Sequence, residues 1–174
     1  MLSVEERLSK FLSKKPSIGT DVFIAPSAVV LGDVTLGNNS SVWYNCVLRG
    51  DINSIIIGSG TNIQDGVIGH LADDYPLIVG NRVTVGHGAV IHACKIEDEC
   101  LVGMNATVLD GAHIGKQSII AAGSVVPVGT VVPEGSLFAG VPGEVKKKLT
   151  VHQRSSLKIL AEKYLSVARA HRAI

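Results

Sequence analysis

Aliphatic residues recur at every sixth position along most of the chain. Cut every six residues from Val102, the C-terminal part reads VGMNAT, VLDGAH, IGKQSI, IAAGSV, VPVGTV, VPEGSL and FAGVPG. Each hexad begins with an aliphatic or aromatic residue, and all but the last carry Ala, Ser or Thr at the fifth position. A helix would place apolar residues at a spacing near 3.6, which a period of six does not provide. The period therefore predicts short strands joined by tight turns.

The same period covers the rest of the chain. From Ile18 the hexads are IGTDVF, IAPSAV, VLGDVT, LGNNSS, VWYNCV and LRGDIN, and after phase slips the pattern resumes at Ile57 and at Val79. A fixed short repeat is typical of a solenoid. Here three hexads would make one triangular coil, with the aliphatic first position pointing inward. The sequence thus predicts a mainly β fold, a parallel β-helix of hexapeptide repeats with six to seven triangular coils.

Both ends of the chain depart from this period. Residues 3–13 predict a short N-terminal helix that begins with SVEE as a capping box. Residues 152–171 predict a C-terminal helix packed on the β-helix, with Ser155 or Ser156 as its N-cap. Its apolar stripe consists of Leu157, Leu160, Tyr164 and Val167. The expected organisation is an N-terminal helical segment over 1–16, the β-helix domain over 17–149 and the C-terminal helix over 150–174.

Composition excludes several classes of partner. The net charge of +1 gives no electrostatic case for binding nucleic acid or an anionic membrane. No apolar stretch is long enough to span a bilayer. The three cysteines lack Cys-x-x-Cys spacing, and the N-terminus has no apolar run typical of a signal peptide. We therefore expect a cytoplasmic protein with no nucleic-acid or membrane partner.

Three of the six histidines fall at related places in the repeat. His70 and His92 both occupy the second position of a hexad, and an inserted turn in LADDYPLI accounts for their separation of 22 residues. They should lie on the same face of adjacent coils, about 4.8 Å apart, where two imidazoles can bind one ion. His87 occupies a third position near another corner, so it would reach an ion bound by a neighbouring chain. This register predicts a site shared between the subunits of a homotrimer.

Three neutral histidines with an open coordination position are typical of catalytic zinc. Such a metal makes a nucleophile from water near neutral pH. The alternative is that outward-facing histidines on a solenoid are ordinary surface residues. The remaining three, His113, His152 and His171, have no matching partner in the repeat and are interpreted as surface residues.

Several motifs together resemble the γ-class carbonic anhydrase family over nearly the whole chain. They are LRGD, TNIQDG, the His70 position, VGHGAVIHAC and ATVLDGAHIG, while AGVPGEV is shared with hexapeptide proteins in general, including acyltransferases. The resemblance implies a left-handed β-helix and reversible hydration of CO₂ to bicarbonate by a metal-bound hydroxide. It implies that His70 and His92 of one subunit bind the metal with His87 of the next. Zn²⁺ is the expected ion, with Fe²⁺ or Co²⁺ as alternatives.

The resemblance also implies roles for residues around the metal. Gln64 and Asn62 match family positions that hydrogen-bond metal-bound solvent or substrate. Tyr164 matches a tyrosine of the C-terminal helix that lies near the site, although packing is an alternative role for it.

A further group of charged residues matches the family's subunit interface. Arg49 and Asp65 resemble a charged pair across this interface, and Asp51 belongs to the same Arg-Gly-Asp motif. Such groups hold metal ligands in orientation. Purely structural ion pairing is the alternative for all three.

The chain also departs from the family pattern. Some members carry a long acidic loop after the first histidine, with a glutamate that exports protons. Here the loop is the short LADDYP, in which Asp73 or Asp74 would have to replace that glutamate, and Ile52 stands where a second glutamate is expected. Hydration of CO₂ releases a proton at each turnover, so the missing groups predict a slow or inactive enzyme.

Three functions therefore remain open at this stage. The first is CO₂ hydration by a metal-dependent homotrimer. The second is a hexapeptide acyl- or acetyltransferase, by fold analogy alone, or a metal-dependent thioesterase. The third is a catalytically silent metal-binding subunit of an assembly. The spacing of the three histidines favours the first.

Overall fold

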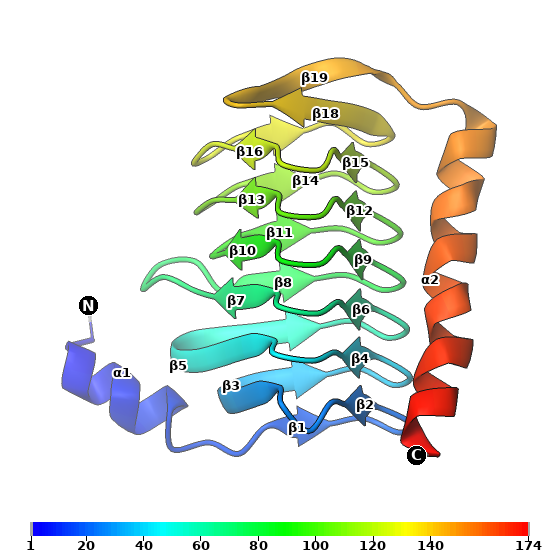
Figure 1. Cartoon of the computed structure of the whole chain (residues 1–174). Coiled ribbons are helices and arrows are strands. Elements are labelled where there is room, and N and C mark those ends of the chain that lie inside the picture. Colours follow the sequence, from blue (N-terminus) through cyan, green and yellow to red (C-terminus); the bar gives the residue numbers. More distant parts are fainter. Residues whose placement is uncertain (1, 174) are drawn as a thin grey trace.

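The computed structural model describes residues 2–173 as a parallel β-solenoid of about seven turns, with a short helix before it and a long helix after it (Figure 1). The turns stack one upon another, and α2 runs along one side of the stack. The β-helix predicted from the six-residue period, with a helix at each end, is confirmed.

Most strands are only two or three residues long, as the hexads require. The helices are α1 Val4–Phe11 and α2 Val151–Arg172. The strands are β1 Ser17–Ile18, β2 Phe23–Ile24, β3 Val29–Leu36, β4 Ser41–Val42, β5 Val47–Ile57, β6 Asn62–Ile63, β7 Ile68–His70, β8 Leu77–Val79, β9 Thr84–Val85, β10 Val90–His92, β11 Lys95–Ile96, β12 Leu101–Val102, β13 Thr107–Val108, β14 His113–Ile114, β15 Ile119–Ile120, β16 Val125–Val126, β17 Val131–Val132, β18 Ser136–Gly140 and β19 Gly143–Lys148.

The strands form three faces of a triangular prism. The first face contains β7, β10, β13, β16 and the first parts of β3 and β5. The second face contains β1, β8, β11, β14, β17 and the last parts of β3 and β5, because these two long strands bend around a corner. The third face contains β2, β4, β6, β9, β12, β15 and β18, and β19 pairs antiparallel with β18 to close one end.

The core is a stack of the first residues of the hexads. On the first face Leu48, Gly69, Ile91 and Val108 are register partners, and the three aliphatic side chains are fully buried. Gly69 interrupts the aliphatic column because a Cβ there would lie 2.6 Å from Leu48 Cδ2 and 3.1 Å from Leu77 Cδ2. Neighbouring leucines therefore fill the space that a side chain at residue 69 would need.

Glycines also stack at the corner between the second and third faces. Gly37, Gly58 and Gly80 directly follow β3, β5 and β8. A Cβ on Gly58 would lie 2.4 Å from the carbonyl oxygen of Gly80, and one on Gly37 would lie 2.6 Å from the amide nitrogen of Ser59. The main chains of successive turns therefore approach each other closely at this corner.

The helices begin at capping boxes. Ser3 and Glu6 cap α1 as predicted, whereas Thr150 and Gln153 cap α2, so the prediction of Ser155 or Ser156 as its N-cap was wrong. These two serines lie inside α2, where their hydroxyls donate back to carbonyls of the preceding turn. Within residues 2–173, no helix combines the length and apolarity needed to cross a membrane.

Helix α2 covers the third face of the prism (Figure 1). Its predicted stripe faces the solenoid, with Leu157 buried and Leu160, Tyr164 and Val167 half-buried. Ala161 and Ala168 complete the buried side. The third face is thus partly covered by the chain's own helix.

The three cysteines lie in this core as free thiols. Burial raises the pKa of Cys46 to about 11 and the pKa of Cys94 and Cys100 to about 12. Since the thiolate is the reactive form, we expect native protein at pH 7.5 to react negligibly with a disulfide reagent such as DTNB. In protein unfolded by guanidinium, all three thiols should react with the reagent. Rapid native labelling would contradict this packing.

Candidate metal centre

Two histidines face each other at the corner between the first and second faces. His70 ends β7 and His92 ends β10, and the two are register partners in neighbouring turns. His70 Nδ1 lies 3.2 Å from His92 Nε2, with ring centroids 5.2 Å apart. The four extra residues in the loop after β7 thus preserve the stacking of these two positions.

A carboxylate holds the outer nitrogen of each ring. His70 Nε2 lies 3.0 Å from Asp51 Oδ1, and His92 Nδ1 lies 2.5 Å from Asp110 Oδ1. Burial alone would raise the pKa of Asp51, but hydrogen bonds from His70 and Arg49 and the charge of Arg49 lower it below its usual value. Asp51, His70, His92 and Asp110 form a continuous column, here named the histidine ladder.

The donor chemistry of the ladder fits a divalent metal ion. Ionised carboxylates require protons on the outer nitrogens, which leaves lone pairs on His70 Nδ1 and His92 Nε2, facing each other. Two nitrogens bound tetrahedrally at 2.0–2.1 Å to zinc lie roughly 3.3–3.4 Å apart, which is close to the 3.2 Å observed.

His87 lies at the next corner, where the chain passes from the third face to the first. Its Nδ1 is 2.8 Å from Asp65 Oδ2, and Asp65 Oδ1 accepts a hydrogen bond from the Tyr44 amide at 3.2 Å. The imidazole is 44% exposed. The carboxylate therefore fixes one nitrogen of His87 and leaves Nε2 available at the surface.

Amide side chains adjoin His87. Gln64 Nε2 donates to Asn62 Oδ1 at 3.1 Å, and Asn62 Nδ2 donates to Thr84 Oγ1 at 3.0 Å. Asn62 and Gln64 are almost fully buried. These bonds fix both amide orientations and leave Gln64 Oε1 as an acceptor. His87, Asp65, Gln64 and Asn62 are here named the His87 corner.

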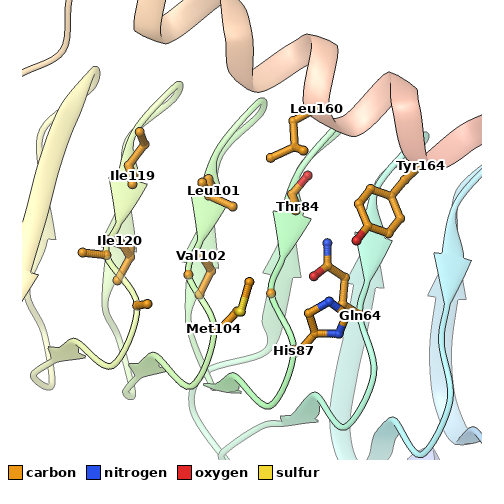
Figure 2. A pocket seen from close by; sticks show the side chains of 14 residues that line it. Gln64, Thr84, His87, Leu101, Val102, Met104, Ile119, Ile120, Leu160 and Tyr164 are labelled. Atoms are coloured by element: carbon orange, nitrogen blue, oxygen red, sulfur yellow. The ribbon is translucent and has the colours of Figure 1, made fainter.

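A cavity of about 360 Å³ opens from the His87 corner and runs beneath α2 (Figure 2). Gln64, His87 and Tyr164 line its polar end. Burial, followed by the negative charge of Asp65, raises the pKa of the Tyr164 hydroxyl. The rest of the cavity is walled by apolar side chains and backbone, including Leu101, Val102, Met104, Ile119 and Leu160. Tyr164 also packs against Trp43, with ring centroids 5.8 Å apart.

The two histidines of the ladder lie in the same two turns as the His87 corner, but at a different corner of the prism. Asp65 lies five residues before His70, and His87 lies five residues before His92. The first face separates the clusters. Within one chain, residues 2–173 contain no group of three or more His, Cys, Asp or Glu side chains able to hold a metal. The paired histidines and the His87 corner therefore stand at one height along the prism axis.

An apolar row runs down the first face between the two corners. Its members are outward-facing register partners: Val29, Val47, Ile68, Val90, Thr107 and Val125. Val29 is 44% exposed and Ile68 is 39% exposed. Helix α1 packs on β5, but within residues 2–173 no helix runs along the first face as α2 runs along the third. An exposed apolar strip of this kind marks a contact surface.

Other predicted residues have partners within the chain. Arg49 forms an ion pair with Asp51, while Asp65 pairs with His87. Asp73 forms an ion pair with Arg7, and Asp74 is exposed. The structure thus places Asp51 and Asp65 against predicted ligands, and it places Asp73 against the N-terminal helix.

Sequence reasoning missed Asp110, which holds His92. A signal was available, because Asp110 follows His92 by 18 residues, the length of one regular turn of three hexads. The same rule leads from His70 back to Asp51, with a separation of 19 residues. Residues one turn apart at a corner are neighbours even where they belong to no recognised motif.

Two of the remaining histidines, His113 and His171, contact other side chains of the chain. His113 Nε2 lies 2.8 Å from Glu97 Oε1 in the neighbouring turn, and this hydrogen bond lowers the pKa of Glu97. His171 packs on Trp43 with ring centroids 4.9 Å apart, because α2 returns to the first turns of the solenoid. His152 is exposed as expected.

Comparison with known proteins identifies the family. The model for bacterial transferase hexapeptide (six repeats) matches residues 15–50 and 93–127. A crystal structure of a hexapeptide transferase family protein from Anaplasma phagocytophilum has a TM-score of 0.84 and 39% identity, covering 89% of this chain and 92% of that one.

Curated relatives extend this likeness to nearly the full length. Mitochondrial gamma carbonic anhydrase 2 of Arabidopsis thaliana is 45% identical over 98% of this chain, which spans only 63% of that protein. A Methanocaldococcus jannaschii protein named "Probable carbonic anhydrase" is 50% identical, over 87% of this chain and 95% of that protein. The chain belongs to the γ-class carbonic anhydrase family, within the hexapeptide-repeat superfamily.

Proposed function

We propose that this protein is a metal-dependent carbonic anhydrase that hydrates CO₂ reversibly as a homotrimer with three sites between subunits. One observation carries the proposal. His70, His87 and His92 each have one nitrogen against a carboxylate, and they stand at two corners of the same turns. The second nitrogens of His70 and His92 face each other. Family membership supports the same activity.

The placement of the half-sites supports a three-fold assembly. A rotation about an axis parallel to the solenoid keeps every residue at its height. It would therefore bring the His87 corner of one chain against the histidine ladder of the next without a shift along the axis. The apolar row between Val29 and Val125 would then be buried around that axis, which adds a hydrophobic contribution to assembly.

The chain offers a complete set of ligands and supports for them. His70 and His92 would hold the metal together with the neighbouring subunit's copy of His87, and imidazole suits Zn²⁺, Fe²⁺ and Co²⁺. When bound, the metal supplies Lewis acidity that lowers the pKa of coordinated water to near 7. Asp51, Asp110 and Asp65 hold the rings in orientation, which such carboxylates do in many metal sites.

The amides and the tyrosine of the His87 corner supply substrate contacts. Gln64 Oε1 offers an acceptor, and the hydrogen bond to Asn62 keeps the amide from turning. Tyr164 offers a hydroxyl that stays protonated, because its pKa is raised. We assign these groups to orienting CO₂ and bicarbonate in the cavity.

Proton release is the weak point of this site. Asp73 is engaged by Arg7, and Asp74 is exposed at the surface of the same loop. Asp74 is therefore the better proton carrier of the two, and bulk buffer must supply much of the transfer. We propose slow, buffer-dependent turnover in a reducing, cytoplasmic compartment that keeps the three thiols free.

Stopped-flow CO₂ hydration by zinc-loaded protein is the direct test. Wild-type protein should accelerate hydration, and the rate should rise with the concentration of imidazole buffer, which replaces the missing proton carrier. His87→Ala should lose both zinc and activity, because every site of the variant lacks its third histidine ligand. His152→Ala, which removes an exposed histidine, is the matched control and should behave like the wild type. Activity that survives in His87→Ala would contradict the shared site.

The cavity beneath α2 favours one second candidate, hydrolysis of a short acyl thioester or ester. Its volume of about 360 Å³ lies within the range of sites for small organic ligands, far above the need of CO₂. Turnover of acyl thioesters by zinc-loaded protein without CO₂ hydration would favour this candidate. Transfer of acetyl groups by metal-free protein would instead favour the acyltransferase class, and zinc binding without any turnover would favour the silent assembly subunit.

A further inference from the structure

A buried arginine on α1 lies beside the histidine ladder. Arg7 is only 8% exposed, although most of its eight-residue helix is exposed. Its Nη1 donates to the carbonyl oxygen of Ile52 at 3.2 Å and to that of Asp73 at 2.9 Å. Its Nε lies 3.5 Å from Asp73 Oδ2. A charged side chain is seldom buried without such partners, so the contacts determine where α1 docks.

The two segments that Arg7 joins carry the first half of the ladder. Ile52 directly follows Asp51 in β5, and the Asp51 carboxylate lies 3.0 Å from His70 Nε2. Asp73 lies three residues after His70, in the loop between β7 and β8. Arg7 therefore bridges β5, which bears the Asp51 carboxylate, and the loop that follows His70.

This loop is the irregular part of the solenoid near the ladder. It holds the insertion that lengthens the step from His70 to His92 to 22 residues, compared with 18 for the step from His92 to Asp110. Asn53 Nδ2 also donates to the carbonyls of Ala72 and Asp73, at 3.0 and 3.1 Å. The loop has no strand pairing between Leu71 and Pro76, so these side-chain bonds and Arg7 hold it against β5.

We propose that Arg7 is a positioning residue for the metal centre. It fastens the loop after His70 to β5, so that the imidazole and the Asp51 carboxylate keep the separation their hydrogen bond requires. The inference rests on the proposed function, because His70 is a metal ligand only in that proposal. Groups that orient a ligand in this way affect metal affinity without touching the metal.

The hydrogen bonds of Arg7 predict how strongly different substitutions at this position will weaken the positioning of the loop. The planar guanidinium reaches two carbonyls and a carboxylate at once, which a lysine ammonium on a flexible stem does less well. Arg7→Lys should therefore retain part of the effect, and Arg7→Ala should lose all of it. Removal of the guanidinium takes one donor from Ile52 and one from Asp73, while Asn53 still holds Asp73.

Zinc affinity, measured by competition with a chromophoric chelator, tests the positioning role. Arg7→Ala should bind zinc about tenfold more weakly than the wild type, which is the lower end of the effect of losing such a support, and Arg7→Lys should lie between them. The cobalt-loaded Arg7→Ala protein should show an altered visible spectrum. Arg82→Ala is the matched control, because Arg82 donates to Glu99 at 2.9 and 3.1 Å at a different corner. It should lower the unfolding temperature and leave zinc affinity unchanged.

Hydrogen exchange of metal-free protein provides an independent readout. The amides of residues 71–75 should exchange faster in Arg7→Ala than in the wild type, and at the wild-type rate in Arg82→Ala. Zinc affinity of Arg7→Ala within twofold of the wild type, or unchanged exchange in the loop, would overturn the proposal and leave Arg7 a packing residue. Wild-type protein that takes up no zinc would overturn the proposed function, and the exchange result would then decide separately whether Arg7 orders the loop.

Discussion

Trimers that combine two inactive chains are expected to regain metal and activity. In the proposed assembly, a His87→Ala chain still has an intact ladder, and a His92→Ala chain still has an intact His87 corner. A site is complete wherever the first chain supplies the ladder and the second supplies His87. Every closed ring of three that contains both chains has one such interface, so about one third of the sites in a mixed trimer should be complete.

Co-expression of the two variants with different affinity tags provides the measurement. Zinc content and CO₂ hydration per mole of doubly tagged trimer should exceed those of either variant alone, which should be close to zero. Co-expression of His87→Ala with a second His87→Ala copy is the control and should remain inactive. Mixed trimers without zinc would show that all ligands of a site belong to one chain, which would contradict the intersubunit arrangement.

A large loss of stability is expected from Gly58→Ala. A Cβ at this position would lie 2.4 Å from the Gly80 carbonyl oxygen, and main chain cannot turn aside as a side chain can. Two turns of the solenoid would have to separate locally. We expect a loss of about 3 kcal/mol, the upper part of the usual range for overpacking. For a chain of this size that lowers the unfolding temperature by roughly 6–12 °C, measured by circular dichroism.

Gly123→Ala is the matched comparison for this substitution. Gly123 has a φ of +67°, and a Cβ there would meet no atom within 4 Å. It therefore adds backbone strain without a clash, costing about 1 kcal/mol and roughly 2–4 °C. Equal losses of stability in Gly58→Ala and Gly123→Ala would mean that the close approach of successive turns is not what excludes a side chain at residue 58.

Much of the fold could be predicted because the first residue of each hexad points into the core. This inward position is usually apolar, as Leu48, Ile91 and Val108 illustrate. The period can therefore be recognised from this one sequence. The stacking of His70 on His92 follows from the same counting once the insertion is recognised. Handedness did not follow from the period and rested on resemblance.

Counting positions could not predict which outer groups pair. Asp65 bonds to His87 and Arg49 bonds to Asp51, a choice that depends on side-chain rotamers at two corners. Arg7 contacts Ile52 and Asp73 from outside the repeat, where no register applies. The contact of His171 with Trp43 depends on the length and docking of α2, which brings residues far apart in sequence together.

The histidine ladder and the His87 corner lie at opposite edges of one face. If each supplies part of a shared site, zinc binding and association of the chains depend on each other. In the proposed trimer each ion holds two chains together, so zinc should favour association and dilution should favour release of zinc. The apparent affinity for metal would then rise with protein concentration, and the apparent strength of assembly would rise with free zinc. Zinc supply in the cell would thereby determine how many chains are assembled as well as how many centres are filled.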